Sequence, residues 1–130
     1  MFHNTLKKPG WNLLLLLIPL IIAGISIYCK ISVGEYFLGG FYDPAYAYLM
    51  NSLNLSQLSG YGVGHFDHPG TTVQTAGAVV IKIFYMFGKI NDDIATDVIS
   101  RPEYYLSRIS FTFIIMTGAA LYILGIAAYR

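Results

Sequence analysis

A carboxylate and a short histidine-rich segment are the residues of this chain whose types and spacing could carry chemistry. Asp43 stands just before Pro44, and the segment His65-Phe66-Asp67-His68-Pro69-Gly70 follows further along. A positioned carboxylate can act as a general base toward a hydroxyl. Imidazoles can hydrogen-bond a phosphate or bind a metal ion. We therefore take the polar stretch from Phe41 to Thr72 as the candidate site of the chain.

The histidine segment leaves three interpretations open. His65, Asp67 and His68 are the residue types of a two-histidine, one-carboxylate metal site. In an extended segment adjacent side chains point in opposite directions, so His68 would need the turn at Pro69-Gly70 to join the other two. A divalent metal site, contact with a phosphate, and loop hydrogen bonding with helix capping are the alternatives. The sequence assigns no definite metal ligand and no definite cofactor.

Asp43 also has the position of a helix cap. Its carboxylate can accept from free backbone N–H groups, and the proline that follows suits the first helical position. Apolar side chains then recur at helical spacing, at Tyr46, Leu49, Met50 and Leu53. This pattern predicts a short interfacial helix at about 44–55 whose apolar stripe faces lipid or neighbouring helices. Capping and proton transfer by Asp43 are compatible, because a cap fixes the rotamer of the carboxylate.

Three hydrophobic stretches must hold this polar region in place. Residues 11–29 and 109–129 carry no charge, and residues 71–88 are interrupted only by Lys82. A run of roughly twenty residues crosses a hydrocarbon core of about 30 Å. The chain is 55% hydrophobic and 12% charged, as in integral membrane proteins. We predict an all-α membrane protein with three transmembrane helices at about 11–29, 71–88 and 109–129. The first helix is expected to stay uncleaved, because no small-x-small cleavage site follows it.

The basic residues predict how these helices are oriented. Three spans would place five basic residues on one side of the membrane: Lys7, Lys8, Lys89, Arg101 and Arg108. The other side would carry two, Lys30 and Arg130. By the positive-inside rule the N-terminus and a loop at 89–108 are cytoplasmic, and the loop at 30–70 is extracytoplasmic. We expect an integral protein of the plasma, or inner, membrane. A net charge of +1 gives no reason to expect nucleic acid as a partner.

Four features in order carry a resemblance to a known enzyme family. They are a helix after a short basic N-terminus, Asp43 early in the outer loop, His68-Pro69 ahead of an apolar stretch at 79–88, and Arg108-Ile109-Ser110 opening a helix. In these features the chain resembles the N-terminal part of the GT-C glycosyltransferases, the family of protein O-mannosyltransferases and lipid A aminoarabinose transferases. The resemblance implies a multi-helix enzyme that moves a sugar from a polyprenyl-phosphate carrier to an acceptor on the outer membrane face.

The same resemblance implies roles for single residues. Asp43 matches the catalytic acidic residue of the first outer loop, and its role would be to accept or orient the proton of the acceptor hydroxyl. That family often follows this aspartate with glutamate, whereas Pro44 stands here, which leaves a two-carboxylate arrangement in question. Five residues are the candidates for substrate binding: Tyr42, Tyr46, His65, Asp67 and His68.

The chain matches only the first helices of such an enzyme. We therefore expect its partners to be the bilayer, a polyprenyl-phosphate-linked sugar and the missing C-terminal helices of a longer protein. The fragment alone should be inactive, since few helices wall a cavity for both carrier and acceptor.

Lys82 and the glycine-rich loop support other interpretations. A lysine within a span is costly, so Lys82 is expected to snorkel to the headgroups, to pair with a missing helix or to contact substrate. A small three-helix scaffold or assembly protein is the main alternative to an enzyme. The loop Gly60-Tyr61-Gly62 after a short helix is also similar to the pore unit of potassium channels. Leu58, however, stands where that filter needs a hydroxyl.

Overall fold

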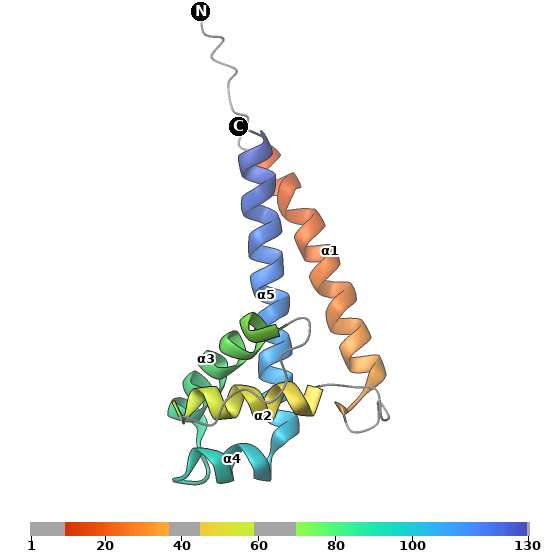
Figure 1. Ribbon diagram of the computed structural model, residues 1–130. Coiled ribbons are helices and arrows are strands. Elements are labelled where there is room, and N and C mark those ends of the chain that lie inside the picture. Colours follow the sequence, from red (N-terminus) through yellow and green to blue (C-terminus); the bar gives the residue numbers. More distant parts are fainter. Residues whose placement is uncertain (1–9, 37–44, 59–69, 130) are drawn as a thin grey trace, which may run out of the picture. The chain divides into compact units, whose positions relative to one another are not determined.

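The computed structural model describes residues 10–36, 45–58 and 70–129 (Figure 1). These residues form helices and no strand, so the predicted all-α class is confirmed for the part of the chain described. The five helices are α1 (Gly10–Val33), α2 (Ala45–Ser56), α3 (Gly70–Gly88), α4 (Ile94–Ser100) and α5 (Pro102–Tyr129). They fall into two compact units, which are described separately. One unit holds α1 and α5 from Phe113 onward, and the other runs from Val33 to Thr112.

The first unit contains most of α1 and the C-terminal part of α5, which are both long apolar helices. Leu13–Val33 and Pro102–Tyr129 have mean hydropathies of 2.3 and 2.0, and each is long enough to cross a bilayer. Only 6% of the most apolar part of α1 is buried, and none of that of α5. The core helix of a soluble protein would instead be mostly covered. The prediction of three membrane-spanning helices is not confirmed, because among the described helices only these two meet the criteria of length and hydropathy.

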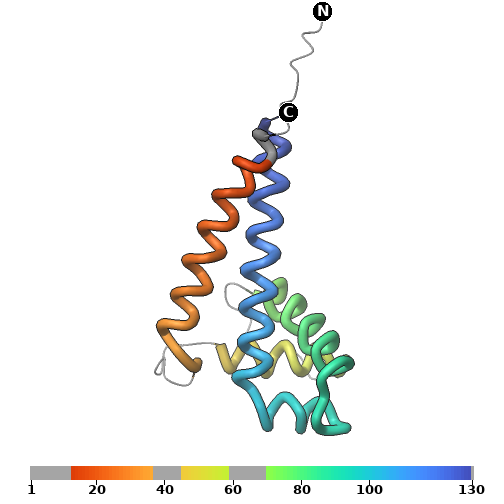
Figure 2. The backbone as a smooth tube through the Cα atoms, turned by 180° about the vertical axis from the view of Figure 1, so that it is seen from behind, coloured from red at the N-terminus to blue at the C-terminus, as the bar shows by residue number. Residues whose placement is uncertain are grey.

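Within this unit α1 and α5 run antiparallel (Figure 2). A Cβ atom placed on Gly118 would lie 4.0 Å from Pro19 Cβ, and one placed on Gly125 would lie 3.6 Å from Leu15 Cδ2. Residues later in α5 thus lie against residues earlier in α1. Small residues at such positions let two helices approach closely in a membrane.

The bounds of α5 differ from the predicted span. The helix begins at Pro102, whereas the predicted span starts at 109, with Arg108-Ile109-Ser110 as its opening. Proline suits the first helical position because its missing N–H needs no partner there. Arg108 therefore lies inside a helix whose first turns belong to the second unit.

The second unit packs parts of four helices around one core. Its buried apolar residues come from every helix of the unit: Leu49 and Leu53 from α2, Ile81 from α3, Val98 from α4, and Tyr105 and Leu106 from α5. Tyr46 and Met50 pack against this core. The predicted apolar stripe of α2 exists, and it faces neighbouring helices.

Close contact between α2 and α3 buries polar residues as well. Asn51 and Ser52 are 7% and 2% exposed, although the sequence placed them off the apolar stripe of α2. A Cβ on Gly77 would collide with the Oγ of Ser52 and lie 3.1 Å from its Cβ. The absence of a side chain at Gly77 therefore lets α2 lie directly against α3, which covers a second face of α2.

Candidate functional site

Most of the predicted site residues lie outside the described part of the chain. Tyr42, Asp43, His65, Asp67 and His68 all fall in the ranges 37–44 and 59–69, and their roles and the metal alternative stay predictions. The helices that follow them are described. Within the described residues, no group of three or more His, Cys, Asp or Glu side chains could hold a metal ion.

A described helix follows each of the two polar motifs. α2 begins at Ala45, directly after Asp43-Pro44, and α3 begins at Gly70, directly after His68-Pro69. Since α2 and α3 pack against each other, both polar motifs lead directly into one helix pair.

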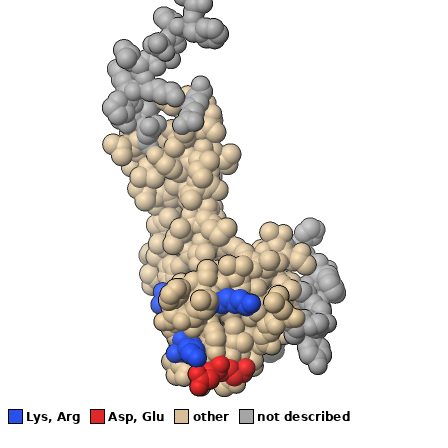
Figure 3. All heavy atoms as spheres, turned by 90° about the vertical axis from the view of Figure 1, so that its left-hand side faces the viewer, with Lys and Arg blue, Asp and Glu red and all other residues tan. Residues whose placement is uncertain are grey.

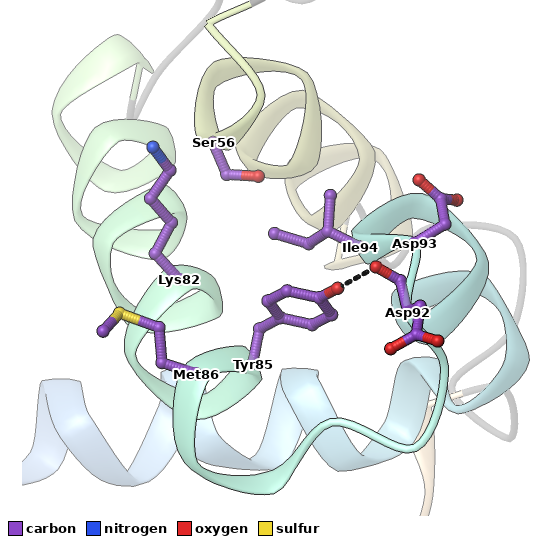
Figure 4. A pocket seen from close by; sticks show the side chains of 7 residues that line it. All are labelled: Ser56, Lys82, Tyr85, Met86, Asp92, Asp93 and Ile94. Atoms are coloured by element: carbon purple, nitrogen blue, oxygen red, sulfur yellow. Dashed lines mark hydrogen bonds between the residues drawn. The ribbon is translucent and has the colours of Figure 1, made fainter.

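This helix pair and the segment that follows α3 border an open cavity of about 450 Å³ (Figure 4). Its lining comes from α2, α3 and the start of α4: Ser56, Lys82, Tyr85, Met86, Asp92, Asp93 and Ile94. A second cavity of about 310 Å³ shares Ser56 and Lys82. Its other walls are mostly apolar: Leu55, Leu58, Thr75, Ala78 and Val79. Lys82 thus stands at an opening that is lined largely by hydrocarbon.

Lys82 makes no ion pair or hydrogen bond within the described residues. Figure 4 shows its ammonium on the Ser56 side of the cavity, away from the carboxylates of Asp92 and Asp93. The hydroxyl of Ser56 donates to the carbonyl of Leu53 at 2.7 Å, so its oxygen lone pairs can accept a further hydrogen bond. The position combines a free cation, a hydroxyl and apolar walls.

The two aspartates at the cavity are already engaged. The carboxylate of Asp92 accepts from the Lys89 ammonium at 2.8 Å, and this hydrogen bond lowers the pKa of Asp92. Asp93 caps α4 by accepting from the Thr96 backbone N–H and hydroxyl, both at 2.8 Å, and the backbone bond lowers the pKa of Asp93. Figure 3 shows acidic and basic side chains gathered side by side at one end of this face. Neither carboxylate neutralises Lys82.

Asp97 is the most enclosed charge in the described structure. Its carboxylate accepts from the backbone N–H groups of Ile90 and Asn91, each at 2.8 Å. The Arg101 guanidinium and the Tyr105 hydroxyl each donate to Oδ2 at 2.5 Å. Burial by itself raises the pKa of Asp97, but the bonds from Tyr105, Arg101 and the two amides outweigh burial and hold this pKa well below its ordinary value.

The Asp97 cluster joins three elements of the second unit. Arg101 also donates to the carbonyl of Gly88 at 2.6 Å, at the end of α3. The cluster therefore ties the end of α3, the turn after it and the start of α5 to α4. The buried carboxylate of Asp97 lines neither of the two cavities described above. The cluster is not among the predicted sites, although the i, i+4 and i+8 spacing of Asp97, Arg101 and Tyr105 is a signal in the sequence that could have identified it.

Glu103 holds the start of α2 against α5. The Tyr46 hydroxyl donates to Glu103 Oε1 at 2.5 Å, and the Tyr36 backbone N–H donates to Oε2 at 3.1 Å. The Tyr36 hydroxyl also hydrogen-bonds Ser110. Tyr46, predicted as a substrate contact, thus has a structural partner, and its contact with substrate stays a prediction.

Arg108 is packed between two aromatic rings. Its guanidinium carbon lies 5.3 Å from the ring centroid of Phe84 and 4.9 Å from that of Tyr104. Such contacts stabilise an arginine without a carboxylate partner. Arg108 thereby joins α5 to α3.

Comparison with known proteins adds no assignment: no protein-family model, curated protein or solved structure matches this chain.

Proposed function

We propose that the chain is the N-terminal part of a membrane glycosyltransferase that moves a sugar from a polyprenyl-phosphate carrier to an acceptor. A carrier of this kind joins a phosphate to a long apolar chain, so its site needs a cation beside a hydrocarbon surface. The Lys82 cavity supplies both, and this observation carries the proposal. Lys82 would contact the carrier phosphate, and the apolar walls of the neighbouring cavity would contact its first prenyl units.

Asp43 would act as the base toward the acceptor hydroxyl, and His65, Asp67 and His68 would contact the carrier phosphate. Asp43 precedes α2 and His68 precedes α3, the two helices whose later turns carry Ser56 and Lys82. Tyr42 and Tyr46 would contact the carrier or sugar. We place this site on the outer face of the plasma membrane, with a cytoplasmic N-terminus.

The decisive experiment measures transfer and carrier affinity in the complete protein that carries this segment. Asp43→Asn should lower turnover by about 100- to 10,000-fold while keeping the fold, because asparagine is also a good N-cap. Lys82→Gln should weaken the affinity for polyprenyl phosphate about 10-fold, whereas Lys89→Gln is the matched control, since Lys89 is already paired with Asp92.

Normal turnover in Asp43→Asn, with poor folding only in Asp43→Ala, would reduce Asp43 to a helix cap. Equal losses of affinity in Lys82→Gln and Lys89→Gln would remove the specific role of Lys82. Dependence on a chelatable cation, lost in the His65, Asp67 and His68 variants alike, would instead establish the metal alternative.

A further inference from the structure

Hydrogen bonds and packing in the second unit bear on how the chain crosses the membrane. If 71–88 crossed the bilayer, residues before it and after it would stand on opposite faces, about 30 Å apart. Yet Tyr46 Oη and Glu103 Oε1 are 2.5 Å apart, and the Tyr36 N–H reaches the same carboxylate. Leu49 and Val98, from the two sides of α3, share one core. A bilayer cannot separate groups in direct contact.

The exposed face of α3 indicates where the membrane lies. Four large apolar side chains recur at helical spacing and are largely uncovered: Val79, Ile83, Met86 and Phe87 are 55%, 46%, 73% and 86% exposed. On a helical projection they fall within one arc of about 100°, opposite the buried Gln74, Gly77 and Ile81. Lys82 flanks one edge of this stripe. α3 thus has one face for the protein core and one for an apolar surface.

We propose that α3 does not cross the membrane: α2, α3 and α4 lie on one side of it, and the stripe of α3 rests in the lipid interface. The chain itself holds this unit at the bilayer, because α1 precedes it and α5 runs out of it into the second span. A lysine at the edge of an apolar face, such as Lys82, fits the anionic headgroups of such an interface. The inference does not depend on the transferase proposal.

Single-cysteine variants of the full chain in a Cys29→Ser background test the topology. Gln57→Cys follows α2 and Asp92→Cys follows α3, and both positions are exposed. With a membrane-impermeant maleimide on intact cells and on permeabilised cells, both should be labelled from the same side and to a similar extent. Labelling from opposite sides would restore α3 as a span. Protection of both until detergent is added would place the unit inside the bilayer and would also overturn the proposal.

A fluorophore that reports polarity tests the stripe. Attached at Phe87→Cys in vesicles with an anionic lipid, it should be blue-shifted and quenched by doxyl-labelled lipids several-fold more than at Asp92→Cys, the matched exposed control. Met86→Cys provides a second reporter if Phe87→Cys folds poorly. Equal, weak quenching at all three positions would show that the stripe does not meet lipid, as expected if another protein segment covers it.

Discussion

Asp97 shows how a single buried charge is stabilised in this chain. Its carboxylate is fully buried, and it receives hydrogen bonds from an arginine, a tyrosine and two backbone amides. Removing one partner of a buried ion pair is costly because the other charge remains without compensation.

We expect Asp97→Asn to destabilise the second unit by about 3 kcal/mol, since Arg101 would lose its carboxylate. Hydrogen exchange followed by mass spectrometry should show faster exchange at Ile90 and Asn91, whose amides now donate to Asp97. Asp93→Asn is the matched control, because asparagine caps a helix about as well as aspartate. Equal exchange in the two variants would mean that the cluster contributes little to stability.

The pKa of Asp97 predicts a dependence on pH. Because folding lowers this pKa, the cluster contributes stability above the ordinary aspartate value of about 4, and this contribution is lost as the pH falls toward the folded-state pKa. Unfolding followed by circular dichroism in detergent between about pH 6 and 2 should show this loss in the unmodified chain and a flatter profile in Asp97→Asn. Parallel profiles would contradict the linkage.

At the scale of elements, the contact between α2 and α3 depends on Gly77. Adding a methyl group there should displace Ser52 and cost about 1–3 kcal/mol of stability. Thermal unfolding of Gly77→Ala should reveal the loss, and Ser52→Ala in the same chain should restore part of it by removing the colliding hydroxyl. Gly24→Ala is the control, because nothing lies within 4 Å of a Cβ at that position. A neutral Gly77→Ala would show that the two helices can separate easily.

The turn that follows α2 contains a residue with a strained backbone conformation. Leu58 has a φ of 52°, in the left-handed region, and it is 85% exposed. A non-glycine residue pays roughly 1–2 kcal/mol in this conformation. Leu58→Gly should therefore raise stability by up to about 1 kcal/mol, whereas Leu58→Ala should not. Thermal unfolding of the two variants provides the measurement, and a gain of the same size in both would point to the loss of an exposed apolar side chain instead.

For the whole molecule, the number of membrane crossings determines on which side of the membrane each basic residue lies. With three spans, Lys89, Arg101 and Arg108 count together with Lys7 and Lys8. With two spans, they lie with Lys30, across the membrane from the N-terminus. The loop between the spans then exceeds the roughly 60 residues over which the positive-inside rule applies well. The cytoplasmic N-terminus consequently stays a prediction that needs direct measurement.

Two crossings place both ends of the described chain on the same side. Reporter domains fused before Met1 and after Arg130, which function on only one side of a membrane, should therefore give the same result for both fusions. Opposite results would favour three crossings. A reporter inserted in the exposed segment at Asp92-Asp93 provides the internal comparison and should report the other side.

A final prediction concerns the activity of this chain alone. The purified 130-residue chain, assayed with a polyprenyl-phosphate sugar, should show no transfer above blank, because a few helices cannot wall a cavity for both substrates. Reproducible transfer that Asp43→Asn abolishes would disprove the fragment interpretation and at the same time support the assignment of Asp43.

The sequence alone determined the helical class and the two most apolar spans. These features depend on local signals: uncharged runs and apolar residues at helical spacing. The tertiary structure decided what those helices do. The composition of α3 is that of an apolar helix and predicts a membrane span. Only the contact of Tyr46 with Glu103, and the shared core of Leu49 and Val98, show that the residues before α3 lie against those after it. Such contacts join residues far apart in the chain, which no local periodicity records. The Lys82 cavity likewise exists only where separate helices come together. The Asp97 cluster instead joins residues within 88–105, and the i, i+4 and i+8 spacing of its side chains is visible in the sequence.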